Sequence, residues 1–227
     1  MRRVRASLTT DIMPDAKPRM RGWSHAAASA GSVLLTVLLC WASRDDWPKM
    51  VAMLVFGLSM VEMYTISAIY HIGRWSERRW RMLRSIDHSN IFLLIAGTYT
   101  PLAAVMLTGW VGTALLIAVW SLALVGVGLS IFVRRLPRAI RSALYVGMGW
   151  ISVLALPAFL QVLPLEAIGL LVLGGGLYTV GAVIYARRRP DPFPRTFGFH
   201  EVFHLLVIAG NLAFVAVMVL WVLPYRG

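Results

Sequence analysis

The sequence predicts an all-α integral membrane protein, a bundle of seven transmembrane helices. The first observation is composition: the 227 residues are 59% hydrophobic and 14% charged, with a mean hydropathy of +0.72, which is too apolar for a soluble domain. The second is that apolar stretches long enough to cross a bilayer recur along the chain. The third is that lysine and arginine are concentrated in alternate connections between these stretches.

Seven apolar stretches reach the length that a transmembrane helix needs, about 20 residues. We expect their boundaries to be correct within about three residues. Together they make residues 23–227 one transmembrane domain. The expected spans are residues 24–43, 48–72, 86–107, 110–132, 140–162, 165–186 and 199–223.

The first 22 residues differ from the rest because they contain six basic residues and no long apolar stretch. We expect them to form a mobile cytoplasmic arm that lies against anionic lipid headgroups. They are not expected to be a signal peptide, because the apolar stretch that follows is long enough to span and is followed by further spans.

The orientation follows from the distribution of basic residues. The arm and the second, fourth and sixth connections contain six, five, four and four of them, whereas the other side has only Arg44, Lys49 and Arg226. The positive-inside rule then places the N-terminus in the cytoplasm and the C-terminus outside. The net charge of +12 is therefore a topology signal and does not indicate nucleic-acid binding. The single cysteine, Cys40, excludes an intrachain disulfide.

The last span opens with Phe199-His200-Glu201-Val202-Phe203-His204. On a helix His200 and His204 lie one turn apart, about 6 Å, so both rings can bind one metal ion. The His-Glu-x-x-His pattern is also that of zinc metalloproteases, whose third ligand usually follows along the chain. Because no His, Asp, Glu or Cys follows His204, we expect a third ligand from upstream.

The predicted topology supplies that ligand. The second span ends at His71, the third begins near Asp87, and the seventh begins near His200, so these residues share one cytoplasmic-side layer. Three neutral imidazoles with one open position are typical of a catalytic zinc whose fourth ligand is water. Asp87 could accept a proton from this water, and Ser67, one turn before His71, could hydrogen-bond the water or an oxyanion. Iron, cobalt or nickel, and a purely structural histidine cluster, remain alternatives.

Other polar residues in the spans receive weaker assignments. His88 points about 100° away from Asp87 and is expected near the headgroups or behind the ligands. His25 is expected to make a cap or an interhelical contact, with a place in the site as the weaker alternative. Glu201 is expected to act either as a protease-style base or as a partner of loop arginines. Glu62 lies in mid-bilayer, where such a residue usually faces protein. Asn211 is expected to join helices.

Two patterns concern helix packing. Tyr99-Thr100-Pro101 predicts a kink in the third span, where proline frees a carbonyl group. In the sixth span, glycines seven residues apart share a face and would permit close approach of another helix. The glycines are Gly169, Gly174, Gly175, Gly176 and Gly181.

In combination, these features resemble the hemolysin III branch of the progestin and adipoQ receptor family, over about residues 22–223. The resemblance rests on seven spans with an inside N-terminus and on three groups of residues. These are Ser67-x-x-Tyr70-His71, then Asp87-His88 followed by Ala96-Gly97-Thr98-Tyr99-Thr100-Pro101, and His200-Glu201-x-Phe203-His204.

The resemblance implies one zinc ion held by His71, His200 and His204, with Asp87 and Ser67 near its water. It also implies a site in the cytoplasmic half, in agreement with the charge distribution, and a bacterial cytoplasmic (inner) membrane protein. Bacterial members commonly have an acidic stretch before the first span, whereas this chain has a basic arm. That difference concerns interactions of the N-terminus and leaves the metal site unchanged.

From these features we expect a metal-dependent hydrolase that acts, like a ceramidase, on a lipid amide or ester whose tail enters between helices. Zinc would polarise the carbonyl and supply hydroxide, while Asp87 and Ser67 would handle the proton and the oxyanion. One alternative is a pore-forming hemolysin or channel. The lack of a visible amphipathic toxin segment argues against it. The other is a receptor-like sensor in which zinc has only the structural role of linking helices.

Overall fold

The computed structural model describes residues 17–107, 109–133 and 136–226. Within these ranges, seven helical segments are long and apolar enough to cross a membrane, as predicted, and no strand forms. The expectations for residues 1–16 and for Arg134 and Arg135 lie outside the described residues. The crossing segments are Trp23–Ala42, Trp47–Ile72, Glu77–Met106, Trp110–Phe132, Arg138–Val162, Leu165–Arg187 and Phe199–Val222.

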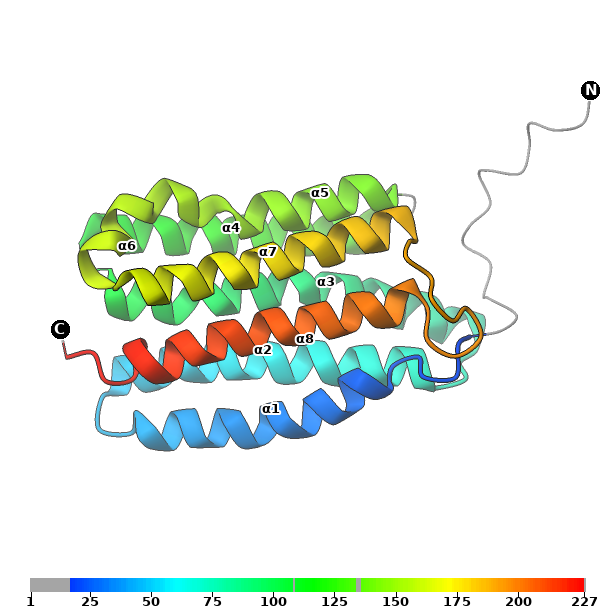
Figure 1. The fold of residues 1–227 in the computed structure, drawn as a ribbon, viewed down its shortest axis with the longest axis horizontal. Helices are drawn as coiled ribbons and strands as arrows, with labels where there is room; N and C mark the ends of the chain where they lie inside the picture. Colours follow the sequence, from blue (N-terminus) through cyan, green and yellow to red (C-terminus); the bar gives the residue numbers. More distant parts are fainter. Residues whose placement is uncertain (1–16, 108, 134–135, 227) are drawn as a thin grey trace, which may run out of the picture.

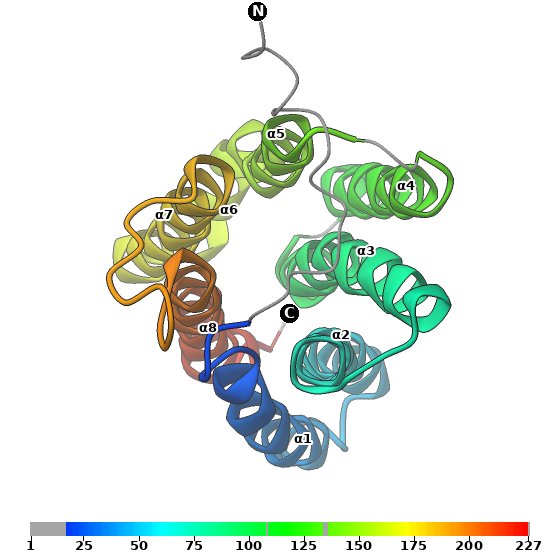
Figure 2. The same cartoon turned by 90° about the vertical axis from the view of Figure 1, so that its right-hand side faces the viewer.

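The helices lie side by side in one elongated bundle (Figure 1). Seen end-on they form a ring, in which α8 (Phe199–Val217) packs against both α7 (Leu165–Arg187) and α1 (Trp23–Ala42) (Figure 2). Closure of the ring therefore brings the first and last helices of the sequence together. The other members are α2 (Trp47–Ile72), α3 (Glu77–Pro101), α4 (Trp110–Phe132), α5 (Arg138–Gly149) and α6 (Leu156–Val162).

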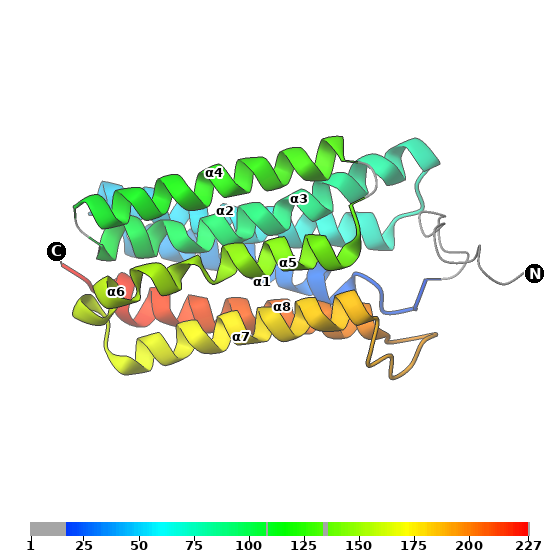
Figure 3. The same ribbon diagram turned by 90° about the horizontal axis from the view of Figure 1, so that it is seen from above.

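Connections alternate between the two ends of the bundle (Figure 3). Residues 73–76 and 188–198 connect helices at the end where α1 and α5 begin (Figure 1). We call this end the arginine-rich end, because it carries the arginines of both connections and of the α5 start. The alternation agrees with the predicted up-and-down topology, while the side of the membrane that this end faces stays a prediction.

Two spans differ from their predicted form. The third helix begins at Glu77 and not near residue 86, since its polar first turns extend beyond the apolar stretch and bury Trp80 and Leu83. The fifth span is interrupted by a 3-10 helix, Ile151–Ala155, between α5 and α6. Pro157, in the first turn of α6, lacks the N–H that a continuous α-helix would need.

The predicted irregularity at Pro101 is present. A π-helical turn, Leu102–Met106, follows directly after α3. The Thr100 hydroxyl donates to the Ala96 carbonyl at 2.9 Å and accepts from the Trp120 indole N–H at 3.2 Å. Side-chain contacts thus supplement the backbone hydrogen bonds next to the proline.

The prediction of close approach at the glycines holds for one of the pairs seven residues apart. A Cβ atom at Gly174 would lie 2.6 Å from the Phe214 ring, and one at Gly181 would lie 3.2 Å from Phe203. Both neighbours belong to α8, so this glycine face joins α7 to α8. Gly169 and Gly176 face open space.

At the opposite end, a buried lysine anchors the end of the chain. Lys49 is 6% exposed, and its Nζ donates to the carbonyl oxygens of Leu223, at 3.3 Å, and Tyr225. Nζ also lies 3.3 Å from the Asp46 carboxylate. This ammonium ties the start of α2 to the segment that follows α8.

Candidate metal centre and its surroundings

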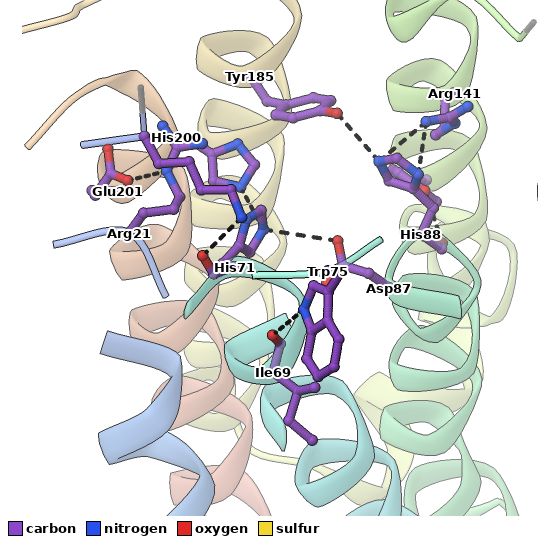
Figure 4. A network of polar contacts seen from close by, with 12 residues as sticks. Arg21, Ile69, His71, Trp75, Asp87, His88, Arg141, Tyr185, His200 and Glu201 are labelled. Atoms are coloured by element: carbon purple, nitrogen blue, oxygen red, sulfur yellow. Dashed lines mark hydrogen bonds and ion pairs between the residues drawn. The ribbon is translucent and has the colours of Figure 1, made fainter. Parts of the chain in front are cut away.

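Three histidines from two helices meet at the arginine-rich end of the bundle. His71 is in the last turn of α2, whereas His200 and His204 are in the first two turns of α8. Each offers one ring nitrogen, and the three nitrogens lie within 4.8 Å of one another. The Nε2 atoms of His71 and His200 are 3.1 Å apart (Figure 4). The predicted ligand set is therefore gathered in one place.

These three residues have the donor type to hold a divalent metal ion, and one pair of nitrogens has a spacing that suits zinc. Zinc–nitrogen bonds of about 2.0–2.1 Å in a tetrahedron put ligand nitrogens about 3.3 Å apart, close to the 3.1 Å between His71 and His200. His204 is 2% exposed, and its Nδ1 has no hydrogen-bond partner among the described residues. A cluster of largely buried imidazoles is suited to bind a divalent metal.

Asp87 and Ser67 lie beside the histidines, as the sequence predicted. The Asp87 Oδ2 atom is 3.9 Å from His71 Nε2 (Figure 4). Asp87 Oδ1 and Ser67 Oγ are buried, and no described residue forms a hydrogen bond with either atom. Together with His200 and His204 they line a cavity of about 20 Å³, which is enough for one water molecule. The unpaired oxygens therefore face a space that a small polar group can enter.

A second cavity, of about 230 Å³, adjoins this small one. Its lining comes mainly from α3, α5, α6, α7 and α8 and is largely apolar. This cavity was not predictable from the sequence, because it depends on how the interrupted fifth span packs. The two cavities share Met63, Ile91, Tyr145, Ala182 and Phe203.

His88 stays outside the ligand set, in agreement with its predicted direction. Its ring nitrogens lie 3.0 and 3.1 Å from one guanidinium nitrogen of Arg141, and Nε2 lies 3.4 Å from the Tyr185 hydroxyl (Figure 4). The Tyr145 hydroxyl donates to the His88 carbonyl at 2.9 Å. His88 thus links α3 to α5 and α7 on the far side of the small cavity.

Glu201, the glutamate of the His-Glu-x-x-His pattern, is held by structural contacts. It is 2% exposed and forms an ion pair with Arg21 (Figure 4). Its other oxygen accepts from the Gly198 N–H at 2.7 Å, which caps the start of α8. Of the two predicted roles, this geometry favours the arginine partner over the protease-style base. That arginine comes from the segment before α1 and not from a loop between spans.

Residues 17–22 cross the arginine-rich end next to the histidines, and we call them the strap. The backbone N–H groups of Arg19 and Met20 donate to Arg195 and Thr196, each at 3.1 Å. Lys17 Nζ donates to the carbonyls of His71 and Gly73, both at 3.3 Å. Burial and the nearby Arg21 guanidinium lower the pKa of the Lys17 amine.

The strap was not foreseen, because the sequence suggested a mobile arm directed at lipids. Its last residue, Gly22, has φ +86°, and a Cβ atom there would lie 2.8 Å from the His71 Cβ. Only glycine suits this position, where the chain turns into α1 against the end of α2. The glycine directly before the first apolar span was the one feature of the sequence that could have indicated this turn.

Two other polar residues complete the comparison with the sequence. Asn211 joins helices, as expected, by donating to the Tyr64 hydroxyl and accepting from the Tyr178 hydroxyl, both at 2.5 Å. The expectation for Glu62 was wrong, since its side chain is exposed on the outer surface of α2. The exposure of Glu62 agrees with helix geometry, because Glu62 lies on the face of α2 opposite His71.

Comparisons with known proteins decide the family. The model of a family described as haemolysin-III related matches residues 15–215. The chain belongs to this haemolysin-III-related family. It is 34% identical over 192 residues to hemolysin-3 of Bacillus cereus, covering 84% of each chain. It is 36% identical over 181 residues to a hemolysin-3 homolog of Bacillus subtilis, covering 79% of this chain and 81% of that one.

A more distant relative is human. The monocyte to macrophage differentiation factor of Homo sapiens is 23% identical over 208 residues, covering 90% of this chain and 83% of the relative. The family match confirms the resemblance inferred from the residue patterns and establishes an integral membrane protein. The haemolysin-III-related match includes the strap, both cavities and all three histidines of the candidate metal centre.

Proposed function

We propose that this haemolysin-III-related protein is a zinc-dependent hydrolase of lipid amides or esters in a bacterial cytoplasmic membrane, with its arginine-rich end in the cytoplasm. One observation carries the proposal. The three clustered imidazoles lie beside a buried oxygen of Asp87 and the buried Ser67 hydroxyl, neither of which forms a well-aligned hydrogen bond with a described residue. The small cavity that Asp87, Ser67, His200 and His204 line adjoins a larger apolar cavity. Buried polar atoms without partners are rare unless they serve a ligand or a reaction.

The residues have distinct roles in such a reaction. A zinc ion bound by His71, His200 and His204 would supply Lewis-acid activation of the carbonyl and of water. Asp87 accepts the proton of the attacking water and passes it to the leaving amine or alcohol. The Ser67 hydroxyl donates a hydrogen bond to the oxygen that gains negative charge.

The apolar cavity supplies the site for the substrate tail. An acyl chain in this cavity exchanges its contacts with membrane lipids for contacts with Ile95, Leu171 and Phe214. Its carbonyl carbon then lies in the small cavity, which is next to the large one and shares lining residues with it. The lining of the larger cavity is apolar and disfavours water around the tail, whereas polar side chains line the small cavity beside Asp87. This arrangement selects a molecule with one long apolar chain and a hydrolysable polar end.

The ligand count favours catalysis over a purely structural zinc. Structural zinc sites normally have four protein ligands, whereas catalytic sites keep one position open. In the part of the chain that the structure describes, the metal-binding group has three residues. The names of the Bacillus relatives suggest lysis, but the buried polar centre is better explained by chemistry than by a pore.

The first test is the zinc content of detergent-purified protein, measured by elemental analysis. We expect about one zinc per chain in the wild type, and none in His71→Ala or His204→Ala, because each removes one of only three ligands. His88→Ala is the control, since His88 belongs to the same layer but faces Arg141. Folded wild-type protein without metal would contradict the proposal.

The second test is turnover. Purified protein is incubated with lipid amides and esters of different chain lengths, and free fatty acid is measured. We expect release that requires zinc and is lost in His71→Ala. Dye release from liposomes that persists in both histidine variants, with no fatty acid formed, would support a pore.

A further inference from the structure

A fourth histidine, His25, lies against the metal centre without joining it. It is in the first turn of α1 and is fully buried, at 0% exposed. Its ring stacks on that of His204, with centroids 3.7 Å apart and planes at 8°. Tyr64 of α2 lies nearby, with its ring centroid 5.1 Å from that of His25. The sequence suggested a cap or an interhelical contact for this residue, with a place in the site as the weaker alternative.

The nitrogens of His25 make no well-aligned hydrogen bond. Both are buried, and their interaction with the His204 backbone falls short of normal hydrogen-bond geometry. Neither belongs to the group of nitrogens that converge within 4.8 Å. What the residue contributes in this geometry is its flat face, which covers the face of His204.

We propose that His25 is a positioning residue that holds the His204 ring in the orientation needed for metal binding. The inference rests on the proposed metal centre. His204 is stacked by His25 on one face, and its Nδ1 has no hydrogen bond to fix the ring. Metal-binding histidines are usually oriented by such a hydrogen bond. Here an aromatic contact takes over that function.

The contact also suits the charge of a metal-bound ring. Binding of a divalent cation withdraws electrons from the His204 imidazole, and the neutral π-system of His25 stabilises the resulting positive charge. A benzene ring has the same property, whereas an aliphatic side chain does not. The role of His25 therefore requires an aromatic ring but not an imidazole.

Zinc affinity tests this inference. Purified, metal-depleted protein is titrated with Zn²⁺ against a fluorescent chelator, for wild type, His25→Phe, His25→Leu and His25→Met. We expect the Leu and Met variants to bind zinc about 10- to 100-fold more weakly, the usual cost of removing a residue that orients a ligand. The Phe variant should stay within about threefold of the wild type, because it keeps the stacked face.

A matched control separates positioning from general disturbance of α1. Ser32 is a buried residue of the same helix, and its hydroxyl donates only to Ser29 of that helix. Ser32→Ala should leave zinc affinity unchanged. Thermal unfolding of the metal-free proteins checks that each variant is folded. If His25→Leu does not fold, His25→Met takes its place as the variant without an aromatic ring.

The outcomes distinguish this inference from the proposed function. Wild-type protein that bound no zinc would overturn the metal centre and, with it, the role of His25. If the wild type binds zinc and the Leu and Met variants bind it equally well, only the present inference is overturned. A Phe variant as weak as the Leu variant would also overturn it, because a nitrogen of His25 would then be required.

Discussion

The histidine layer and the apolar cavity are neighbours, but they are built on different principles. Around the histidines, side chains from α1, α2, α3 and α8 meet through ring stacking, an ion pair and hydrogen bonds from the strap. Around the cavity, contacts are almost entirely apolar and the fifth span is broken by a 3-10 helix. Directional contacts fix positions closely, whereas apolar contacts tolerate different shapes. The first region is thus suited to chemistry and the second to a variable tail.

The largest effect is expected from Asp87→Asn, which alters the chemical region alone. The amide has nearly the same shape but cannot accept the proton, so turnover should fall by about 10²- to 10⁴-fold. Zinc content should stay at the wild-type level, because Asp87 is outside the group of three ligands. Fatty-acid release and elemental analysis on the same preparation check both points. Full activity in this variant would remove Asp87 from the mechanism.

The cavity is tested by filling it from α7. A Cβ atom at Gly175 would point toward Trp150, 3.7 Å away, within the cavity lining, whereas one at Gly176 would meet nothing within 4 Å. Gly175→Leu should displace about three methylene groups of a long acyl chain, at about 0.8 kcal/mol each. We therefore expect kcat/KM for long-chain substrates to fall by about 10- to 50-fold.

The paired variant, Gly176→Leu, makes the same change in helix propensity on the outer side. It should leave kcat/KM unchanged for every chain length. Short-chain substrates should also be little affected by Gly175→Leu, since their tails do not reach that depth. Equal losses in the two variants would show that the helix, and not the cavity, was disturbed.

The strap is expected to have a smaller effect, on the rate of metal loss. Arg21→Ala breaks the ion pair with Glu201 but leaves the Gly198 cap intact. The strap should then open more often, and zinc should transfer to an excess of chelator about three- to tenfold faster. The amount of zinc bound at equilibrium should stay near one per chain.

Arg19→Ala provides the control for that experiment. Arg19 is exposed, and its substitution removes the same charge from the strap. Its hydrogen bond to Arg195 is made by the backbone N–H. Its zinc should be lost at the wild-type rate. Identical rates in all three proteins would show that the strap does not limit access to the metal centre.

The smallest effect on the site is expected from Lys49→Met, at the far end of the bundle. Removing the ammonium leaves the carbonyls of Leu223 and Tyr225 without this partner, which costs about 2 kcal/mol. Thermal unfolding in detergent should occur about 4–8 °C lower. Zinc content and turnover below the transition should not change. A change in either would mean that the two ends of the bundle are coupled.

The sequence allowed the fold and the ligand set to be predicted because both depend on one-dimensional signals. Hydropathy gives the spans, and basic residues give their alternation, so His71 and His204 fall at one level without any knowledge of packing. The strap and the stacking of His25 depend on which helices become neighbours when the ring closes. The basic residues of the strap suggested lipid contact, because sequence alone does not show that Arg21 has a buried carboxylate beside it.

The position of the histidines at one end of the bundle, and not at its middle, has a consequence for the bilayer. A lipid can bring its carbonyl to this depth only from the leaflet at the arginine-rich end. Turnover would then cleave the acyl chain from a lipid in that leaflet alone. The area of one monolayer would change relative to the other, so the activity of this protein would appear as membrane curvature as well as free fatty acid.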